Sequence, residues 1–365
     1  MDYMTERNKT ESKVIKMQDY SDFKMSFEIP IIKAMEKINA NSQGIVFICD
    51  NDNAVIAALT DGDIRRHILT GKTLEAPAIE AANRNFRYVT TDDEYKNAHK
   101  TCIEESLTAL PKLNERGHIT AIYLMNETNS TINPQISVPV VIMAGGKGTR
   151  LYPYTKVLPK PLVPIGEDTI TEYIMNRFID YGCNDFTMIV NHKKNMIKAY
   201  FSEEGQKYNI KFIDEDIPLG TGGGLKLLKK SITSTFFMSN CDVLIFADYA
   251  EILSLHKETD NIITMICAAK TLTVPYGTVE VNNEGVISSL IEKPSLSFLT
   301  NTGIYVIEPR FLDYIEPYVF THITDSIQKC IDAGERVGVY PVSEGQWSDM
   351  GQLEEMEKMQ RLLGI

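Results

Sequence analysis

The feature that most constrains the fold of this 365-residue chain is a glycine-rich loop placed directly after a charge-free apolar run. The run begins at Val140, is rich in β-branched residues, and is typical of a buried strand in a parallel sheet. It leads into Gly145, Gly146 and Gly148. Glycines allow a backbone to approach an anion closely and to turn its N–H groups toward it. The pattern therefore predicts an α/β domain with an anion-binding loop at the end of one strand.

Three basic side chains follow the glycines. Arg150, Lys156 and Lys160 can neutralise several phosphate charges, so we interpret the loop as a site for a nucleoside triphosphate. Its spacing fits neither the Walker A loop nor the Rossmann dinucleotide loop. The alternative is a strand-to-helix turn with no ligand, and glycine content alone does not separate the two.

The composition excludes some classes of partner. A net charge of −12 argues against general binding of nucleic acid, which needs many cationic contacts to phosphates. No apolar run reaches the length of roughly 18–20 residues that a membrane helix needs. The six cysteines lack C-x-x-C spacing and the six histidines lack an H-E-x-x-H pattern, so neither structural zinc nor a disulfide framework is expected. We therefore expect a cytoplasmic protein.

A polar linker separates two patterned regions. Before it, a helix face, an apolar strand, a turn and a second strand occur twice, about 64 residues apart, which suggests two copies of one supersecondary unit. After it, strands alternate with helical patterns, as in an α/β domain with a mainly parallel, mixed sheet. The predicted divisions are a disordered segment or arm at 1–15, the repeat at 16–126, the linker at 127–137, and the α/β domain at 138–365.

The first copy of the repeat ends in Thr60-Asp61-Gly62-Asp63, which resembles the T-x-x-D element of a tandem CBS-domain pair. The resemblance implies an α+β regulatory domain in which Thr60 and Asp63 hold the phosphate and ribose of an adenine nucleotide. The second copy lacks this element, so at most one such site is expected. The alternatives are that Asp63 only caps a helix, or that the pair is a dimerisation module of a homo-oligomer.

The glycine loop, together with Pro159-Lys160-Pro161, resembles the sugar-1-phosphate nucleotidylyltransferases, whose pattern is G-G-x-G-T-R-L-x-P-x-T-x-x-x-P-K-P. The match is complete in residue type and spacing. The resemblance implies a Rossmann-like nucleotidyltransferase domain from Val138 onward. It also implies that a second glycine run, after Leu219, lies against the nucleotide, where a side chain would collide. The nucleotide-binding residues that it implies are Ala144, Gly145, Gly146, Gly148, Thr149, Gly220, Thr221 and Gly222.

Two aspartates are the candidate metal ligands. Asp242 follows an apolar strand, and Asp349 follows Trp347 far downstream. Magnesium takes one or two carboxylates and completes its shell with phosphate oxygens and water. In the resemblance both residues match metal-ligand positions, whereas either one alone is more typical of a turn or a helix cap. The implied cofactor is Mg²⁺.

Three elements match sugar-binding positions of the same family. Gly277 leaves room for a hexose ring, Glu292 offers a carboxylate to sugar hydroxyls, and Asn301 offers an amide to a further hydroxyl. Lys293 offers an ammonium to phosphate. A Glu-Lys pair is by itself common on protein surfaces.

The reaction implied by the resemblance is in-line attack of a sugar 1-phosphate on the α-phosphorus of the triphosphate, with loss of pyrophosphate. Catalysis then rests on positioning and charge neutralisation. Arg150 would hold pyrophosphate, and Lys160 and Lys293 would hold the other phosphates. Magnesium on Asp242 and Asp349 would bridge the triphosphate.

The resemblance also bears on the substrates. The Pro-Leu-Gly-Thr form after residue 217 resembles mannose-1-phosphate guanylyltransferases. CBS-fused members of this group resemble the guanylyltransferases of legionaminic acid pathways, which use glucosamine 1-phosphate and serve cell-surface glycans. We therefore expect GTP. The alternatives are the same reaction with UTP, CTP or dTTP, and a non-catalytic nucleotide sensor.

Overall fold

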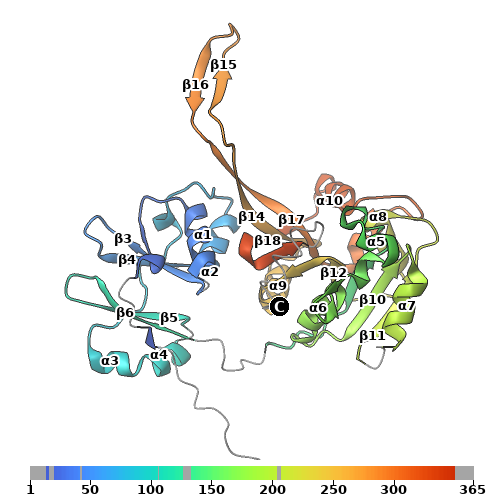
Figure 1. Ribbon diagram of the computed structural model, residues 1–365, viewed down its shortest axis with the longest axis horizontal. Coiled ribbons are helices and arrows are strands. Elements are labelled where there is room, and N and C mark those ends of the chain that lie inside the picture. Colours follow the sequence, from blue (N-terminus) through green and yellow to red (C-terminus); the bar gives the residue numbers. More distant parts are fainter. Residues whose placement is uncertain are drawn as a thin grey trace, which may run out of the picture. The chain divides into compact units, whose positions relative to one another are not determined.

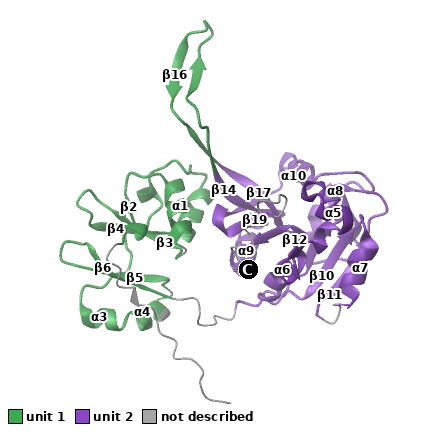
Figure 2. Cartoon of the chain, viewed as in Figure 1, with its two compact units in different colours: residues 1–131, 271–297 green, residues 132–270, 298–365 purple. Residues whose placement is uncertain are grey.

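The computed structural model describes residues 14–15, 20–41, 43–105, 107–125, 133–203 and 207–349. The chain divides into two compact units, coloured separately in Figure 2. The first unit is Met1–Thr131 with Thr271–Ser297, and the second is Ile132–Lys270 with Phe298–Ile365. Most of the predicted arm at 1–15 and the first half of the predicted linker at 127–137 lie outside the described residues.

The first unit contains two matching hairpins. Strands β3 (Ile45–Cys49) and β4 (Val55–Thr60) pair antiparallel, as do β5 (Ala109–Leu113) and β6 (Ile119–Leu124). Each pairing shifts register at the same place, one residue before the first strand ends. The internal repeat inferred from the sequence is therefore present as repeated structure.

The turns of the two hairpins are built alike. The carboxylate of Asp50 accepts the backbone N–H groups of the residues two and four positions on, at 3.0 and 2.9 Å. The side-chain oxygen of Asn114 accepts the equivalent pair at 2.9 and 3.0 Å. The N–H of Val55 donates to the carbonyl of Gly117, so the two turns contact each other. Such Asx turns explain why Asp and Asn occupy these positions.

Short helices and a ribbon complete the first unit. Strand β2 pairs parallel with β3, and β1 pairs antiparallel with β6, giving two three-stranded sheets. Strands β15 and β16 form a separate two-stranded ribbon. The remaining bounds are β1 (Val14–Ile15), β2 (Lys24–Ser26), α1 (Ile31–Asn41), α2 (Asp61–Leu69), α3 (Asp92–Lys96), α4 (Ala98–Glu104), β15 (Thr278–Val281) and β16 (Ile287–Ile291).

A seven-stranded sheet organises the second unit, in the order β11-β10-β7-β12-β17-β14-β18 (Figure 1). Strand β7 (Val140–Ala144) has all five residues buried and lies between β10 and β12, parallel to both. β17 is antiparallel to β12, so the sheet is mixed but mostly parallel. The predicted α/β class with a mainly parallel sheet is confirmed. The β-branched, charge-free run is buried on both faces because helices cover both sides of such a sheet.

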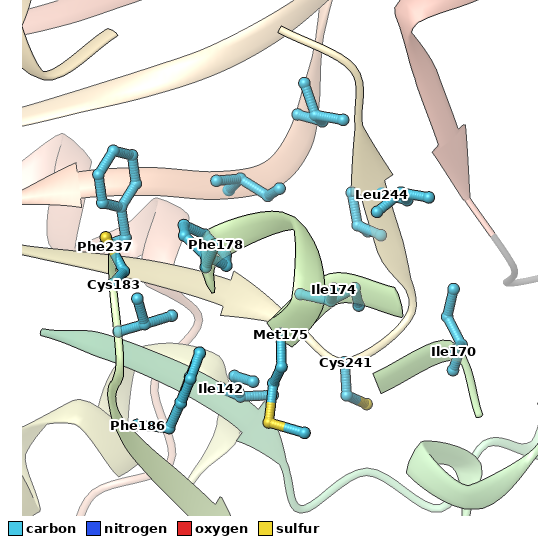
Figure 3. Close-up of a cluster of buried hydrophobic side chains, with 14 of the residues drawn as sticks. Ile142, Ile170, Ile174, Met175, Phe178, Cys183, Phe186, Phe237, Cys241 and Leu244 are labelled. Atoms are coloured by element: carbon cyan, nitrogen blue, oxygen red, sulfur yellow. The ribbon is translucent and has the colours of Figure 1, made fainter. Parts of the chain in front are cut away.

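Helix α6 (Ile170–Ile179) shows how the core is assembled. A capping box between Thr169 and Glu172 begins the helix. Its apolar face, with Phe178 fully buried, packs against Ile142 of β7 and Phe237 of β12, as Figure 3 shows. This packing holds α6 against β7, the strand that leads into the glycine loop.

The other elements of the second unit are mostly short. Strands β13 and β19 pair antiparallel beside the main sheet. After the second glycine run the chain forms a 3₁₀ segment, Gly224–Leu228, and glycine disfavours the α-helix. The bounds are α5 (Tyr154–Val157), β8 (Pro164–Ile165), β9 (Asp168–Thr169), β10 (Asp185–Val190), α7 (Lys194–Glu203), β11 (Asn209–Asp214), α8 (Gly220–Gly223), β12 (Phe236–Asn240), β13 (Val243–Ile245), α9 (Tyr249–Glu258), β14 (Ile263–Thr273), β17 (Ser295–Ile307), α10 (Ile323–Asp332), β18 (Val337–Ser343) and β19 (Trp347–Asp349).

All six cysteines are buried free thiols. Among the described helices, none is both long enough and apolar enough to cross a membrane.

Candidate active site

Two adjoining cavities open at the carboxyl ends of the central parallel strands. The first, of about 440 Å³, is lined from the glycine loop and from the residues that follow β10, β11 and β12. The second, of about 380 Å³, is lined by β17, β19 and the start of α10. Four residues line both cavities and so mark their boundary. They are Arg150, Thr221, Asn240 and Asp242.

At two of the three glycines of the loop, neighbouring side chains of the protein occupy the space that a Cβ would need. A Cβ on Gly145 would lie 2.9 Å from a carboxylate oxygen of Glu215. Gly148 has φ of 65°, and a Cβ there would lie 3.0 Å from side-chain carbons of Thr155 and Lys160. A Cβ on Gly146 would meet nothing within 4 Å. Gly146 is therefore the position where the loop leaves open space at the first cavity.

A buried carboxyl group, Glu215, forms the inner wall of the first cavity. It follows β11 directly, and its N–H donates to the carbonyl of Val190 at 2.8 Å. The amide of Asn191 donates to the Glu215 carbonyl at 2.8 Å, which ties the ends of β10 and β11 together. Burial raises the pKa of Glu215 to about 7, although the N–H of Leu219 donates to the carboxylate and opposes the rise.

Two predicted site residues pair with each other: the Lys160 ammonium forms an ion pair with the buried Asp242 carboxylate. Burial alone would lower the pKa of Lys160, but the anionic groups beside it, Asp242 and Asp349 among them, outweigh burial and raise it. Asp349 lies opposite Val243 in the β13–β19 pair, so the two predicted metal ligands are brought to one edge. Both line the second cavity.

This pair of carboxylates fits magnesium. Within the described ranges no cluster of three or more His, Cys, Asp or Glu side chains has the geometry of a metal site. Magnesium needs no such cluster, because one or two carboxylates suffice when substrate phosphates supply further ligands. Asp242 and Asp349 could hold it in that way.

The second glycine run packs against a distant loop. The N–H groups of Gly222 and Gly223 donate to the carbonyl of Thr321 at 2.9 and 3.1 Å. A Cβ on Gly220 would lie 2.7 Å from that carbonyl, and one on Gly222 would lie 2.9 Å from His322. The backbone of residues 319–323 therefore already excludes side chains here, which is a reason for these glycines that the sequence did not indicate. The docked loop brings Phe320 to the first cavity and His322 to the second.

The predicted residues separate into three groups. Ala144, Gly148, Thr149 and Gly222 do not belong to the described lining of either cavity, and Ala144 is core. Gly277, Glu292 and Lys293 belong to the first unit, where a Cβ on Gly277 would lie 2.9 Å from the Glu292 carboxylate. The predicted residues that line a cavity are Gly145, Gly146, Arg150, Lys160, Gly220, Thr221, Asp242, Asn301 and Asp349.

Sequence reasoning missed several lining residues. Asn191 and Glu215 each lie one residue beyond a strand, and Asn240 ends one. Polar residues at the carboxyl ends of parallel strands are the signal that could have found them. Phe320 and His322 carry no comparable signal, because a contact across about a hundred residues brings them to the site.

In the first unit, Thr60 and Asp63 are engaged with each other. The Thr60 hydroxyl donates to the Asp63 carboxylate at 2.7 Å, and the two form a capping box at the start of α2. Arg66 forms an ion pair with the same carboxylate. The helix-cap role weighed above is thus present in the structure.

Comparisons with known proteins found proteins of similar sequence and structure. A uridylyltransferase for glucose 1-phosphate from Synechocystis is 32% identical over 239 residues, covering 58% of this chain and 60% of that protein. A mannose-1-phosphate guanyltransferase from Schizosaccharomyces pombe is 31% identical with the same coverage, so this chain spans about three fifths of the length of these relatives. The crystal structure of HddC from Yersinia pseudotuberculosis aligns with 62% of this chain and 99% of its own, at 24% identity and a TM-score of 0.49. The nucleotidyl transferase family matches residues 139–363, and the chain therefore belongs to that family.

Proposed function

We propose that the second unit transfers a nucleotidyl group from a nucleoside triphosphate to a sugar 1-phosphate and releases pyrophosphate. The observation that carries this proposal is the pair of adjoining cavities with Arg150 and Asp242 at their boundary. Each cavity falls in the size range of about 300–1,000 Å³ that is usual for small-molecule sites. The similarity to a glucose-1-phosphate uridylyltransferase and a mannose-1-phosphate guanyltransferase supports the reaction class.

The chemistry needs no covalent intermediate on the protein. An oxygen of the sugar phosphate forms a bond to the α-phosphorus, and the bond from that phosphorus to the β-phosphate oxygen breaks. The electron pair of the broken bond leaves with pyrophosphate. In this proposal Arg150 holds the departing pyrophosphate and Lys160 holds the phosphate that stays, so both cations act where charge accumulates. The open backbone at Gly146 lets the triphosphate approach the loop.

Asp242 and Asp349 hold Mg²⁺ in this proposal. A bound magnesium ion neutralises phosphate charge and fixes the orientation of the triphosphate. The Lys160 ammonium, which is paired with Asp242, lies beside this proposed metal position.

The base is proposed to be guanine, and Glu215 is the reason. In its ionised form the Glu215 carboxylate accepts two hydrogen bonds side by side, which matches the two neighbouring N–H donors on the Watson–Crick edge of guanine. Uracil and thymine present one N–H between two carbonyls, which a carboxylate repels. The lining of the same cavity includes Phe320 and Pro218, which offer apolar surface to a base.

The proposed sugar substrate is a hexose 1-phosphate, and glucosamine 1-phosphate is one candidate. The Asn301 amide is largely engaged within the protein, since its oxygen accepts the Gly303 N–H at 2.9 Å and its nitrogen donates to the Tyr305 hydroxyl at 2.6 Å. One N–H of that amide is left for a sugar hydroxyl.

For the first unit, the proposal is a regulatory module that binds an adenine nucleotide at Thr60 and Asp63. The repeated hairpins support the resemblance to a CBS pair, and the capping box supports the alternative in which these residues only begin α2. A dimerisation role in a homo-oligomer is the second alternative.

The experiment is an assay of pyrophosphate release with each of GTP, UTP, CTP, dTTP and ATP against a panel of sugar 1-phosphates. Fast release with GTP and one hexose 1-phosphate is expected. Release with another nucleotide alone overturns the base assignment. Tight nucleotide binding without any release supports the non-catalytic sensor instead.

A further inference from the structure

Asn240 lies where the two cavities meet. It is the last residue of β12, which runs parallel to β7, and it is paired in register with Met143 just before the glycine loop. Its side chain lines both cavities, as do those of only three other described residues. In the proposed reaction the two substrates meet at this boundary, so a group here is next to the phosphorus that is attacked.

The side-chain amide of Asn240 is positioned by close packing against Gly303 and not by a hydrogen bond to any described residue. Gly303 has φ of 91°, and a Cβ there would collide with the side-chain nitrogen of Asn240. The Gly303 N–H is itself fixed by the side chain of Asn301 at 2.9 Å. A glycine in this conformation therefore makes room for the Asn240 amide and limits its movement.

Neighbouring asparagines use their amides inside the protein. Asn191 donates its amide N–H to the carbonyl of Glu215, and Asn301 donates to Tyr305. The side-chain amide of Asn240 forms no hydrogen bond to any residue that the structure describes. A half-buried amide beside a cavity is expected to use its donors, and here the free side is the cavity.

We propose that Asn240 is a further catalytic residue, whose amide N–H donates to a non-bridging oxygen of the α-phosphate as that phosphate is transferred. This inference rests on the proposed function. Charge on the non-bridging oxygens changes as the sugar phosphate approaches and pyrophosphate departs, so a donor aimed at them stabilises the transition state. A neutral donor lacks the charge attraction that Arg150 and Lys160 exert on the triphosphate, so its contribution is expected mainly in turnover and less in binding.

The test uses the full-length protein with Asn240→Ala and Asn240→Asp. Loss of one such donor typically lowers kcat by about 10²–10³-fold, and KM for the triphosphate should change by less than about threefold. Asn240→Asp should be at least as slow, because it replaces the donor with a negative charge of nearly the same shape. Asn209→Asp, which adds the same charge at an exposed position on β11, is the matched control and should keep wild-type kinetics.

A second readout separates contact from structural damage. The two diastereomers of the triphosphate with sulfur on the α-phosphorus place a poor acceptor at one non-bridging oxygen or the other. The ratio of their rates should change about tenfold in Asn240→Ala relative to wild type, whereas a loosened site slows both equally. Gly303→Ala, which displaces the amide without removing it, should show the same change in ratio.

The outcomes are distinguishable. If the wild-type protein transfers nucleotide and the Asn240 variants keep its kcat, or lose kcat with an unchanged diastereomer ratio, the assignment of Asn240 is wrong. If the wild-type protein transfers nothing to any sugar 1-phosphate, the proposed function is wrong, and the assignment of Asn240 falls with it.

Discussion

Glu215 and Gly145 are in direct apposition: a carboxylate oxygen of Glu215 lies 2.9 Å from the position that a Cβ on Gly145 would occupy. The glycine loop is thus packed onto the carboxyl group that forms the inner wall of the first cavity. Gly146, one residue further, has no such neighbour within 4 Å. A side chain at Gly145 would collide with Glu215, whereas one at Gly146 would enter the open space of the cavity. The two positions can therefore be tested separately.

We predict that Gly146→Ala slows nucleotidyl transfer while leaving thermal stability unchanged. Its added methyl group enters open space at the cavity and meets only ligand. Gly148→Ala should lower the free energy of unfolding by about 1–2 kcal/mol, because a left-handed backbone conformation disfavours alanine. Thermal melts and initial rates of both variants check this. A destabilised Gly146→Ala protein would show that the loop is packed where the structure leaves it open.

Glu215→Gln should change the base that the protein accepts. A carboxamide offers one acceptor and one donor, which suits the N–H and adjacent carbonyl of uracil or thymine and leaves a guanine donor unpaired. Mismatched polar groups in a buried site cost a factor of about 10² or more in discrimination. The ratio of kcat/KM for GTP to that for UTP should therefore fall at least a hundredfold. An unchanged ratio would mean that Glu215 does not face the base.

The raised pKa of Glu215 predicts that the free energy of unfolding depends on pH. Burial raises the pKa of Glu215 to about 7 in the folded protein, above the usual value of about 4.3 in the unfolded chain. The folded state therefore holds the proton more tightly, so this residue's contribution to stability is lost as pH rises from about 4 through 7. Glu215→Gln, which has no proton to lose, should melt at a higher temperature than wild type at pH 8 and at the same temperature near pH 4. Equal melting temperatures at pH 8 would contradict the raised pKa.

Much of the scaffold was predictable from local pattern. The alternation of strands and helices after the linker was predicted and is present, with β10 and α6 as examples, because period and capping chemistry are local properties. The loop containing Arg150 was found for the same reason, since residue type and spacing within one segment carry its signal.

The parts that sequence reasoning missed depend on contacts between distant segments. The loop carrying Thr321 packs against the glycines after Leu219, and no signal in the sequence indicated that contact. Glu215 could be identified as a site residue only from the pairing of β11 with β10, which places the end of β11 beside the end of β10. Local propensity carries no information on either contact.

Asp242→Asn and Asp349→Asn should each lower magnesium-dependent turnover by about three orders of magnitude or more, because each variant removes one of the two anionic ligands proposed to orient the metal and the triphosphate. Asp242→Asn also leaves the Lys160 ammonium without its partner, so some loss of stability is expected for that variant alone. Asp332→Asn, exposed on α10, is the matched control. Rates near wild type in both site variants at ordinary magnesium concentrations would contradict the metal assignment.

The capping boxes at the starts of α2 and α3 allow a test of Thr60 with Thr91 as its control. Thr60→Ala and Thr91→Ala remove equivalent caps, at α2 and α3, and each should cost about 1 kcal/mol of stability in that unit. Only Thr60→Ala should also abolish binding of AMP, measured calorimetrically on the full-length protein with GTP present to fill the catalytic site. If AMP binds neither the wild type nor either variant, the residues serve only as caps.

The most direct test of the account follows the phosphorus atoms through one turnover. The protein is incubated with magnesium, a hexose 1-phosphate and GTP labelled at either the α- or the γ-phosphate, and the products are separated. The account predicts that α-label appears in a sugar nucleotide and γ-label in pyrophosphate, in equal amounts. Release of γ-label as inorganic phosphate, or retention of both labels in GTP with every sugar phosphate offered, would contradict it.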